Sequence, residues 1–78
     1  MKLLESTSGS GDTSYTYSGS STANSLSFSN DGSGDATLVV NGATITVKPG
    51  EALDISFKVP YTAVEITTTG AWRMLVGD

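Results

Sequence analysis

The Asn-Gly pair at positions 41 and 42 lies between two runs of β-forming residues, Ala36–Val40 and Ala43–Val47. Because both residues of the pair accept positive φ angles, they predict a two-residue type I′ turn and a tight antiparallel hairpin. The turn also sets the register, with Val40 opposite Ala43 and the remaining residues paired outward from there. This feature restricts the fold more strongly than any other, because it places an antiparallel pair of strands in the middle of the chain.

The register sorts the side chains of the hairpin onto two faces, because directly paired residues share a face. The predicted buried face consists of Ala36, Leu38, Val40, Ala43, Ile45 and Val47. The opposite, weakly polar face consists of Thr37, Val39, Thr44 and Thr46. This second face has little charge to repel neighbours, so it is a candidate interface with another copy or with a larger protein. The β propensity of threonine on a solvated surface explains the same pattern equally well.

Alternation of apolar and polar residues with period two recurs along the chain, as is typical of half-buried strands. The expected strands cover residues 13–18, 23–29, 36–41, 43–47, 53–59, 64–69 and 71–76. In one of them, four apolar residues share a face: Leu53, Ile55, Phe57 and Val59. We therefore expect an all-β domain over residues 15–78. It should be a small antiparallel β-sandwich or a partly closed barrel of about seven short strands.

The first 14 residues differ in composition from the rest of the chain. Residues 5–14 are polar and hold no large apolar side chain, so they predict a flexible leader over residues 1–14, or an expression remnant. The short apolar start ends at Glu5, which argues against a secretion signal. No apolar run approaches the roughly 20 residues of a transmembrane helix.

Histidine and cysteine are both absent from the sequence. Their absence excludes disulfides, thiolate metal sites and histidine-based catalytic triads. Asp54 and Glu65 are the carboxylates that suggest a glycosidase pair, but nothing in the sequence gives them a cleft. A solvated surface explains them better. We expect neither an enzyme nor a bound cofactor.

Acidic residues outnumber basic ones by eight to four, which gives a net charge of −4. The four basic residues are scattered: Lys2, Lys48, Lys58 and Arg73. Binding to nucleic acid or to an anionic membrane requires clustered basic residues, so neither partner is expected. A single core in a chain of 78 residues without disulfides is small, and this favours a homo-oligomer.

Two groups of residues are candidate binding sites. Asp31 and Asp35 could supply oxygen ligands to calcium, although a glycine-containing Asx turn explains them better. An exposed aromatic platform could bind a surface glycan or another protein, whereas in so small a domain the single Trp more often fills the core. Its candidate members are Tyr15, Tyr17, Tyr61 and Trp72.

From Leu26 onward the chain resembles small β modules of structural proteins from tailed bacteriophages and prophages of Gram-positive bacteria. The segments that carry the resemblance are SFSNDGSGD at 27–35, VNG at 40–42, ITVKPGE at 45–51 and ITTTGAWR at 66–73. It implies a virion-associated piece of a tail, a baseplate or a head decoration. Such a protein would be found in the virion, or in the bacterial cytoplasm before assembly.

These observations together predict a non-catalytic structural module that self-associates or docks on a larger virion protein. The alternative is a module that binds carbohydrate or a cell surface through exposed aromatic residues.

Overall fold

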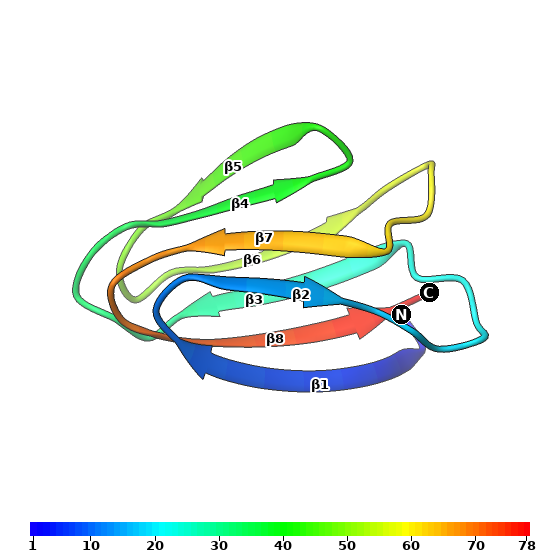
Figure 1. The fold of residues 1–78 in the computed structure, drawn as a ribbon, viewed down its shortest axis with the longest axis horizontal. Helices are drawn as coiled ribbons and strands as arrows, with labels where there is room; N and C mark the ends of the chain where they lie inside the picture. The colour runs from blue at the N-terminus through cyan, green and yellow to red at the C-terminus, as the bar shows by residue number, and fades with distance from the viewer.

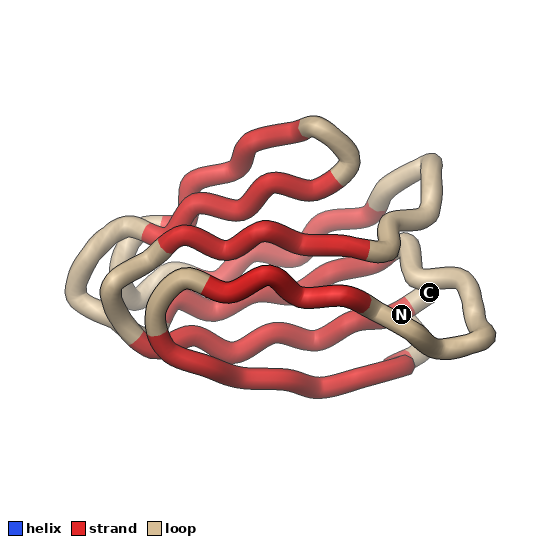
Figure 2. Tube along the Cα trace, viewed as in Figure 1, coloured by secondary structure: helices blue, strands red, loops and turns tan.

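The computed structural model describes all 78 residues and contains only β-strands, turns and loops (Figure 2). The strands are β1 (Leu3–Ser10), β2 (Thr13–Thr16), β3 (Ser25–Asn30), β4 (Ala36–Val40), β5 (Ala43–Val47), β6 (Ala52–Ser56), β7 (Ala63–Thr67) and β8 (Ala71–Gly77). The predicted all-β class is confirmed. No helix that could cross a membrane is present.

The eight strands form two four-stranded antiparallel sheets packed face to face (Figure 1). One sheet has the order β1-β8-β3-β6 and the other the order β2-β7-β4-β5. The sheets do not close into a barrel, so the sandwich is the correct one of the two expected architectures. Strands pair as β1 with β8, β2 with β7, β3 with β6 and β4 with β5, as in one long hairpin rolled up on itself. This is the topology of a jelly roll.

The central hairpin has the predicted turn and register. Asn41 has a φ of 50° and Gly42 a φ of 79°, as a type I′ turn requires, and Val40 lies opposite Ala43. The predicted inner residues of β4 are fully buried, whereas Ala43 of β5 is exposed. Ala43 lies inward in register but at the end of an edge strand, where the facing sheet no longer covers it.

The hydrophobic core comes mainly from the four central strands of the two sheets, β3, β8, β4 and β7. Their buried apolar side chains are Leu26, Phe28, Ala36, Leu38, Val40, Val64, Ile66, Trp72, Met74 and Val76. The four edge strands β1, β2, β5 and β6 contribute mostly half-buried residues. The core is therefore a single layer of side chains between the two sheets, and it becomes thinner toward the edge strands on both sides of the sandwich.

The turn before β6 has the form of a type II turn, because Gly50 at its third position has a φ of 78° and Glu51 N–H donates to Lys48 C=O. The strand itself is shorter than expected. It ends at Ser56, and Val59, which was expected on the inner face, is 66% exposed. Pro60 follows closely and cannot donate to a strand ladder, so the chain leaves the sheet before Val59.

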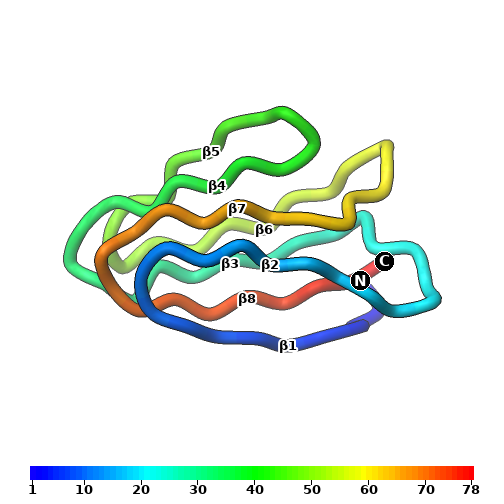
Figure 3. Tube along the Cα trace, viewed as in Figure 1, coloured from blue at the N-terminus to red at the C-terminus, as the bar shows by residue number.

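The expectation of a flexible leader over residues 1–14 is corrected by the structure. Strand β1 pairs with β8 from Leu3 to Ser10, with a β-bulge between Leu3 and Glu5, and β2 begins at Thr13. An edge strand gains its ladder from main-chain hydrogen bonds, which do not require large apolar side chains. Leu4 packs against the core, and Gly9 fits over the indole of Trp72, where a Cβ atom would lie 2.7 Å from a ring carbon. The two chain ends lie at the same end of the molecule (Figure 3).

Candidate interaction surfaces

The outer face of the β2-β7-β4-β5 sheet is rich in threonine, and we call it the threonine face. Its members are Ser14, Thr16, Thr37, Val39, Thr44, Thr46, Ala63, Glu65 and Thr67. All four residues predicted as an interface belong to it. Thr37 lies between Thr46 on β5 and Thr67 on β7, which forms one cross-strand row. In the next row Val39, 39% exposed, lies between Thr44 and Glu65.

This face is nearly free of charge. Glu65 is the one charged residue in the four strands of its sheet, and its carboxylate accepts a hydrogen bond of 2.7 Å from the Ser14 hydroxyl. The other sheet holds Glu5, Asp54 and Arg73, and the remaining charged residues lie in loops and at the chain ends. Charge is thus kept away from the flat surface that a partner could cover at the lowest desolvation cost.

The outer face of the β1-β8-β3-β6 sheet is instead lined with serine. A shallow depression of about 370 Å³ lies there, and its outward side chains are Ser6, Ser8, Ser27, Ser29, Arg73 and Leu75. Leu75 is 39% exposed between serines of β1 and β3. The depression arises because small side chains flank the larger ones of β8. Arg73 is the one charged residue among those that line it.

Each of the two carboxylates considered for calcium forms an ion pair with a basic side chain. Asp31 receives two hydrogen bonds from the guanidinium of Arg73, at 2.7 and 3.1 Å. This bidentate contact lowers the pKa of Asp31 and raises the pKa of Arg73. Asp35 pairs with Lys48 at 3.1 Å. No group of three acidic side chains gathers around this loop, and Gly32 N–H donates to Asn30 Oδ1 as in an Asx turn.

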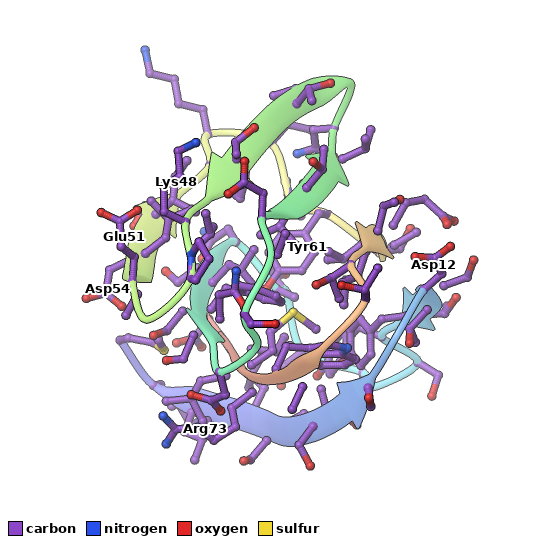
Figure 4. All side chains as sticks on the ribbon, turned by 90° about the vertical axis from the view of Figure 1, so that its left-hand side faces the viewer. Asp12, Lys48, Glu51, Asp54, Tyr61 and Arg73 are labelled. Carbon is purple, nitrogen blue, oxygen red and sulfur yellow. The ribbon has the colours of Figure 1, made fainter.

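Two of the four candidate aromatic residues are buried and cannot form a platform. Trp72 is 2% exposed and stacks on Phe28 with ring centroids 5.9 Å apart. Tyr61 is 1% exposed, and its hydroxyl donates to the main-chain oxygen of Ser25 at 2.6 Å. Burial raises the pKa of Tyr61 to about 12. Figure 4 shows Tyr61 between the layers, with Asp54 and Arg73 at the periphery.

Tyr15 and Tyr17 are half-buried and pack against the same core. The Tyr15 hydroxyl donates to the carboxylate of Glu5, which ties β2 to β1 across the side of the sandwich. Burial, assisted by this carboxylate, raises the pKa of Tyr15. The rings of Tyr15 and Tyr17 therefore fill the space between the two sheets at this side of the sandwich. They contribute to packing and do not form the predicted aromatic platform.

The two carboxylates considered for a glycosidase pair point in opposite directions. Asp54 lies on the outer face of the β1-β8-β3-β6 sheet, and Glu65 lies on the outer face of the other sheet. The whole core separates them, so they cannot act on one bond from two sides.

The sequence interpretation missed part of both surfaces. It did not connect Ser14 or Glu65 with the threonine face, because the pairing of β7 with β2 and β4 is set by distant parts of the chain. It also overlooked Ser6, Ser8 and Ser10, although their alternation with Thr7 and Gly9 has the period of a strand.

Comparison with known proteins found no match: no protein family, no curated protein and no solved structure matches this chain. Inferences about its function therefore come from the surfaces of the molecule itself.

Proposed function

We propose that this chain is a non-catalytic assembly module of a bacteriophage or prophage particle, which docks through its threonine face onto a larger particle protein. The module would act as a small rigid block, with the jelly roll holding the docking surface flat. Jelly rolls occur in viral capsid proteins and in lectins, but they also serve many other functions. The proposal therefore depends on the surface and not on the fold alone.

The observation that carries the proposal is the position of Val39. This apolar residue is 39% exposed in the middle row of the face, between Thr44 on β5 and Glu65 on β7, and the next row holds Thr46, Thr37 and Thr67. Protein interfaces are depleted of charge at their cores, and this face has one carboxylate, Glu65. Short threonine side chains lose little rotamer freedom on contact, so they are suited to close packing against another sheet.

Binding of carbohydrate through exposed aromatic rings has no support in the arrangement of these residues. Trp72 and Tyr61 are buried, and Tyr15 and Tyr17 pack against the side of the core. We therefore do not retain that alternative.

The proposal is tested by following the chain in lysates of the bacterium that encodes it. The wild-type chain should sediment with intact particles, whereas Val39→Glu, which places a charge at the centre of the face, should stay in the supernatant. Ser20→Glu is the matched control, because it adds the same charge in the exposed β2–β3 loop. A wild-type chain that never sediments with particles, or a Val39→Glu variant that sediments normally, would contradict the proposal.

A further inference from the structure

The turn at Asn41 and Gly42 has a covalent reactivity that the fold leaves exposed. In an asparagine-glycine pair, the main-chain nitrogen of the glycine can attack the side-chain amide carbon of the asparagine, because glycine has no Cβ to block the approach. Both residues are exposed, and a Cβ atom on Gly42 would meet no residue within 4 Å apart from its two chain neighbours. The Gly42 N–H makes no hydrogen bond within the chain, so solvent can remove its proton.

The fold restrains the other residues that could react in this way. Asp31 also precedes a glycine, but its carboxylate is bound to Arg73, and the Gly32 N–H donates to Asn30 Oδ1 at 3.0 Å. Asn30 itself is 1% exposed, and its amide makes two further hydrogen bonds. Asn24 is half-buried and precedes a serine. The asparagine at position 41 is therefore the one that combines an exposed side chain with an unhindered glycine after it.

One hydrogen bond holds the Asn41 side chain. Its Nδ2 donates to the main-chain oxygen of Val59 at 2.7 Å, which joins the hairpin turn of one sheet to the loop that follows β6 of the other sheet. The turn and this loop lie at the same end of the molecule (Figure 1). The bond is the one hydrogen bond that residues 58–60 make, and Val59 is 66% exposed. A single exposed contact of this kind opens by local fluctuation.

We propose that Asn41 is a site of spontaneous deamidation, and that the reaction releases the loop at 58–60 from the hairpin turn. The Gly42 nitrogen loses its proton to solvent and bonds to Asn41 Cγ, while the Cγ–Nδ2 bond breaks and the amide nitrogen takes up a proton and leaves as ammonia. Water then opens the five-membered imide at one of its two carbonyl carbons. The products are aspartate and isoaspartate, in which the main chain runs through Cβ. The reaction needs only water, so it does not depend on the proposed function.

Either product removes the link between the turn and the loop. An ionised carboxylate has no N–H to donate, so at position 41 it would face the Val59 oxygen as one acceptor against another. It also adds a negative charge at the tip of the hairpin. Isoaspartate in addition lengthens the main chain of a two-residue turn, and the length of this turn fixes the pairing of Val40 with Ala43.

Incubation of the folded chain in mildly alkaline buffer tests the reaction, with peptide mapping by mass spectrometry and enzymatic methylation of isoaspartyl groups as readouts. A free peptide of residues 38–44 gives the reference rate without the fold. Asn41 in the folded chain should react within about tenfold of the peptide rate, and Asn24 and Asn30 should stay intact. The variant Asn41→Gly/Gly42→Asn keeps two residues that accept positive φ, but alanine now follows the asparagine. Its conversion should be slower by about tenfold or more.

Limited digestion with trypsin reports the release of the loop, because Lys58 lies in the loop, whereas Arg73 lies within β8. Asn41→Asp reproduces the aspartate product and should be cleaved after Lys58 about threefold faster than the wild type, or more. Thr44→Asp is the matched control, because it adds the same charge near the turn and keeps the Asn41 amide.

Two results would overturn the proposal. Conversion at Asn41 that is slower than in the peptide by more than about tenfold would show that the fold protects this site. Cleavage after Lys58 at the same rate in Asn41→Asp, Thr44→Asp and the wild type would show that the loop does not depend on the Asn41 amide.

Discussion

The side-chain amide of Asn30, on β3 of one sheet, donates to the main-chain oxygen of Val47, on β5 of the other sheet, at 2.9 Å. Asn30 is 1% exposed, and its amide also donates to Gly34 C=O while its oxygen accepts from Gly32 N–H. One buried polar side chain thus satisfies three main-chain groups and connects the two layers of the sandwich. A buried polar group is tolerated at such a position because its hydrogen-bonding capacity is used.

Replacing the side chain of Asn30 should destabilise the domain. We expect Asn30→Ala to lower the free energy of unfolding by about 2–3 kcal/mol, because it leaves buried main-chain groups without partners. Urea denaturation followed by tryptophan fluorescence measures the loss. Asn24→Ala is the control, because the Asn24 side chain makes no hydrogen bond. Equal losses for the two variants would show that the Asn30 bonds contribute nothing specific.

The two faces of β4 should differ in sensitivity. Leu38 is fully buried, so Leu38→Ala should cost about 2–5 kcal/mol, which can exceed the stability of so small a domain. Thr37→Ala, on the outer face, should change the stability of the isolated chain by no more than about 0.5 kcal/mol. Chemical denaturation of the two variants side by side checks this. Comparable losses would mean that the face assignment is wrong.

Two loops approach each other so closely that only glycine fits between them. A Cβ atom on Gly70 would lie 2.7 Å from the Cα of Gly32, a main-chain atom that cannot rotate away. Gly70→Ala should therefore cost about 1–3 kcal/mol by forcing the loops apart. Gly34→Ala is the matched control, because its nearest neighbour at 3.3 Å is the movable hydroxyl of Thr69. In thermal unfolding, Gly70→Ala should have a clearly lower melting temperature than Gly34→Ala.

Alkaline pH should unfold the domain. Burial raises the pKa of Tyr61 from 10.0 to about 12, so the folded state keeps its proton where the unfolded state loses it. The stabilisation from this group is fully present below pH 10 and is lost as the pH rises toward 12. The free energy of unfolding, measured by urea titration at several pH values, should fall across this window. Tyr61→Phe should make the fall shallower, and a flat profile in the wild type would contradict the assignment.

Local rules were sufficient for much of this fold. The turn at positions 41 and 42 and the alternation in β4 and β5 depend on residues next to each other, so their register could be predicted. The pairing of β1 with β8 joins the two ends of the chain, and no local pattern encodes such a contact. The sequence analysis therefore missed strand β1. It also predicted strand β6 to be longer than it is.

The candidate sites show the same difference between features set by local sequence and features set by long-range pairing. The threonine face was predictable because it follows from one hairpin, whereas its extension to Thr67 and Glu65 required the pairing of β4 with β7. The aromatic platform failed because exposure of Trp72 and Tyr61 is decided by how the sheets pack, and a core this small needs its largest side chains inside. The ion pairs of Asp31 and Asp35 were not predictable from a local pattern, because their partners Arg73 and Lys48 lie 42 and 13 residues further along the chain.

Amide hydrogen exchange along β1 tests the central claim that this strand is part of the sandwich. The amides of Thr7, Gly9 and Gly11 point toward β8 and should exchange slowly at every protein concentration. Those of Ser6 and Ser8 point away from β8 and should exchange fast. Slow exchange at Thr7, Gly9 and Gly11 beside fast exchange at Ser6 and Ser8 is the predicted result, and fast exchange at all five positions would contradict the pairing of β1 with β8.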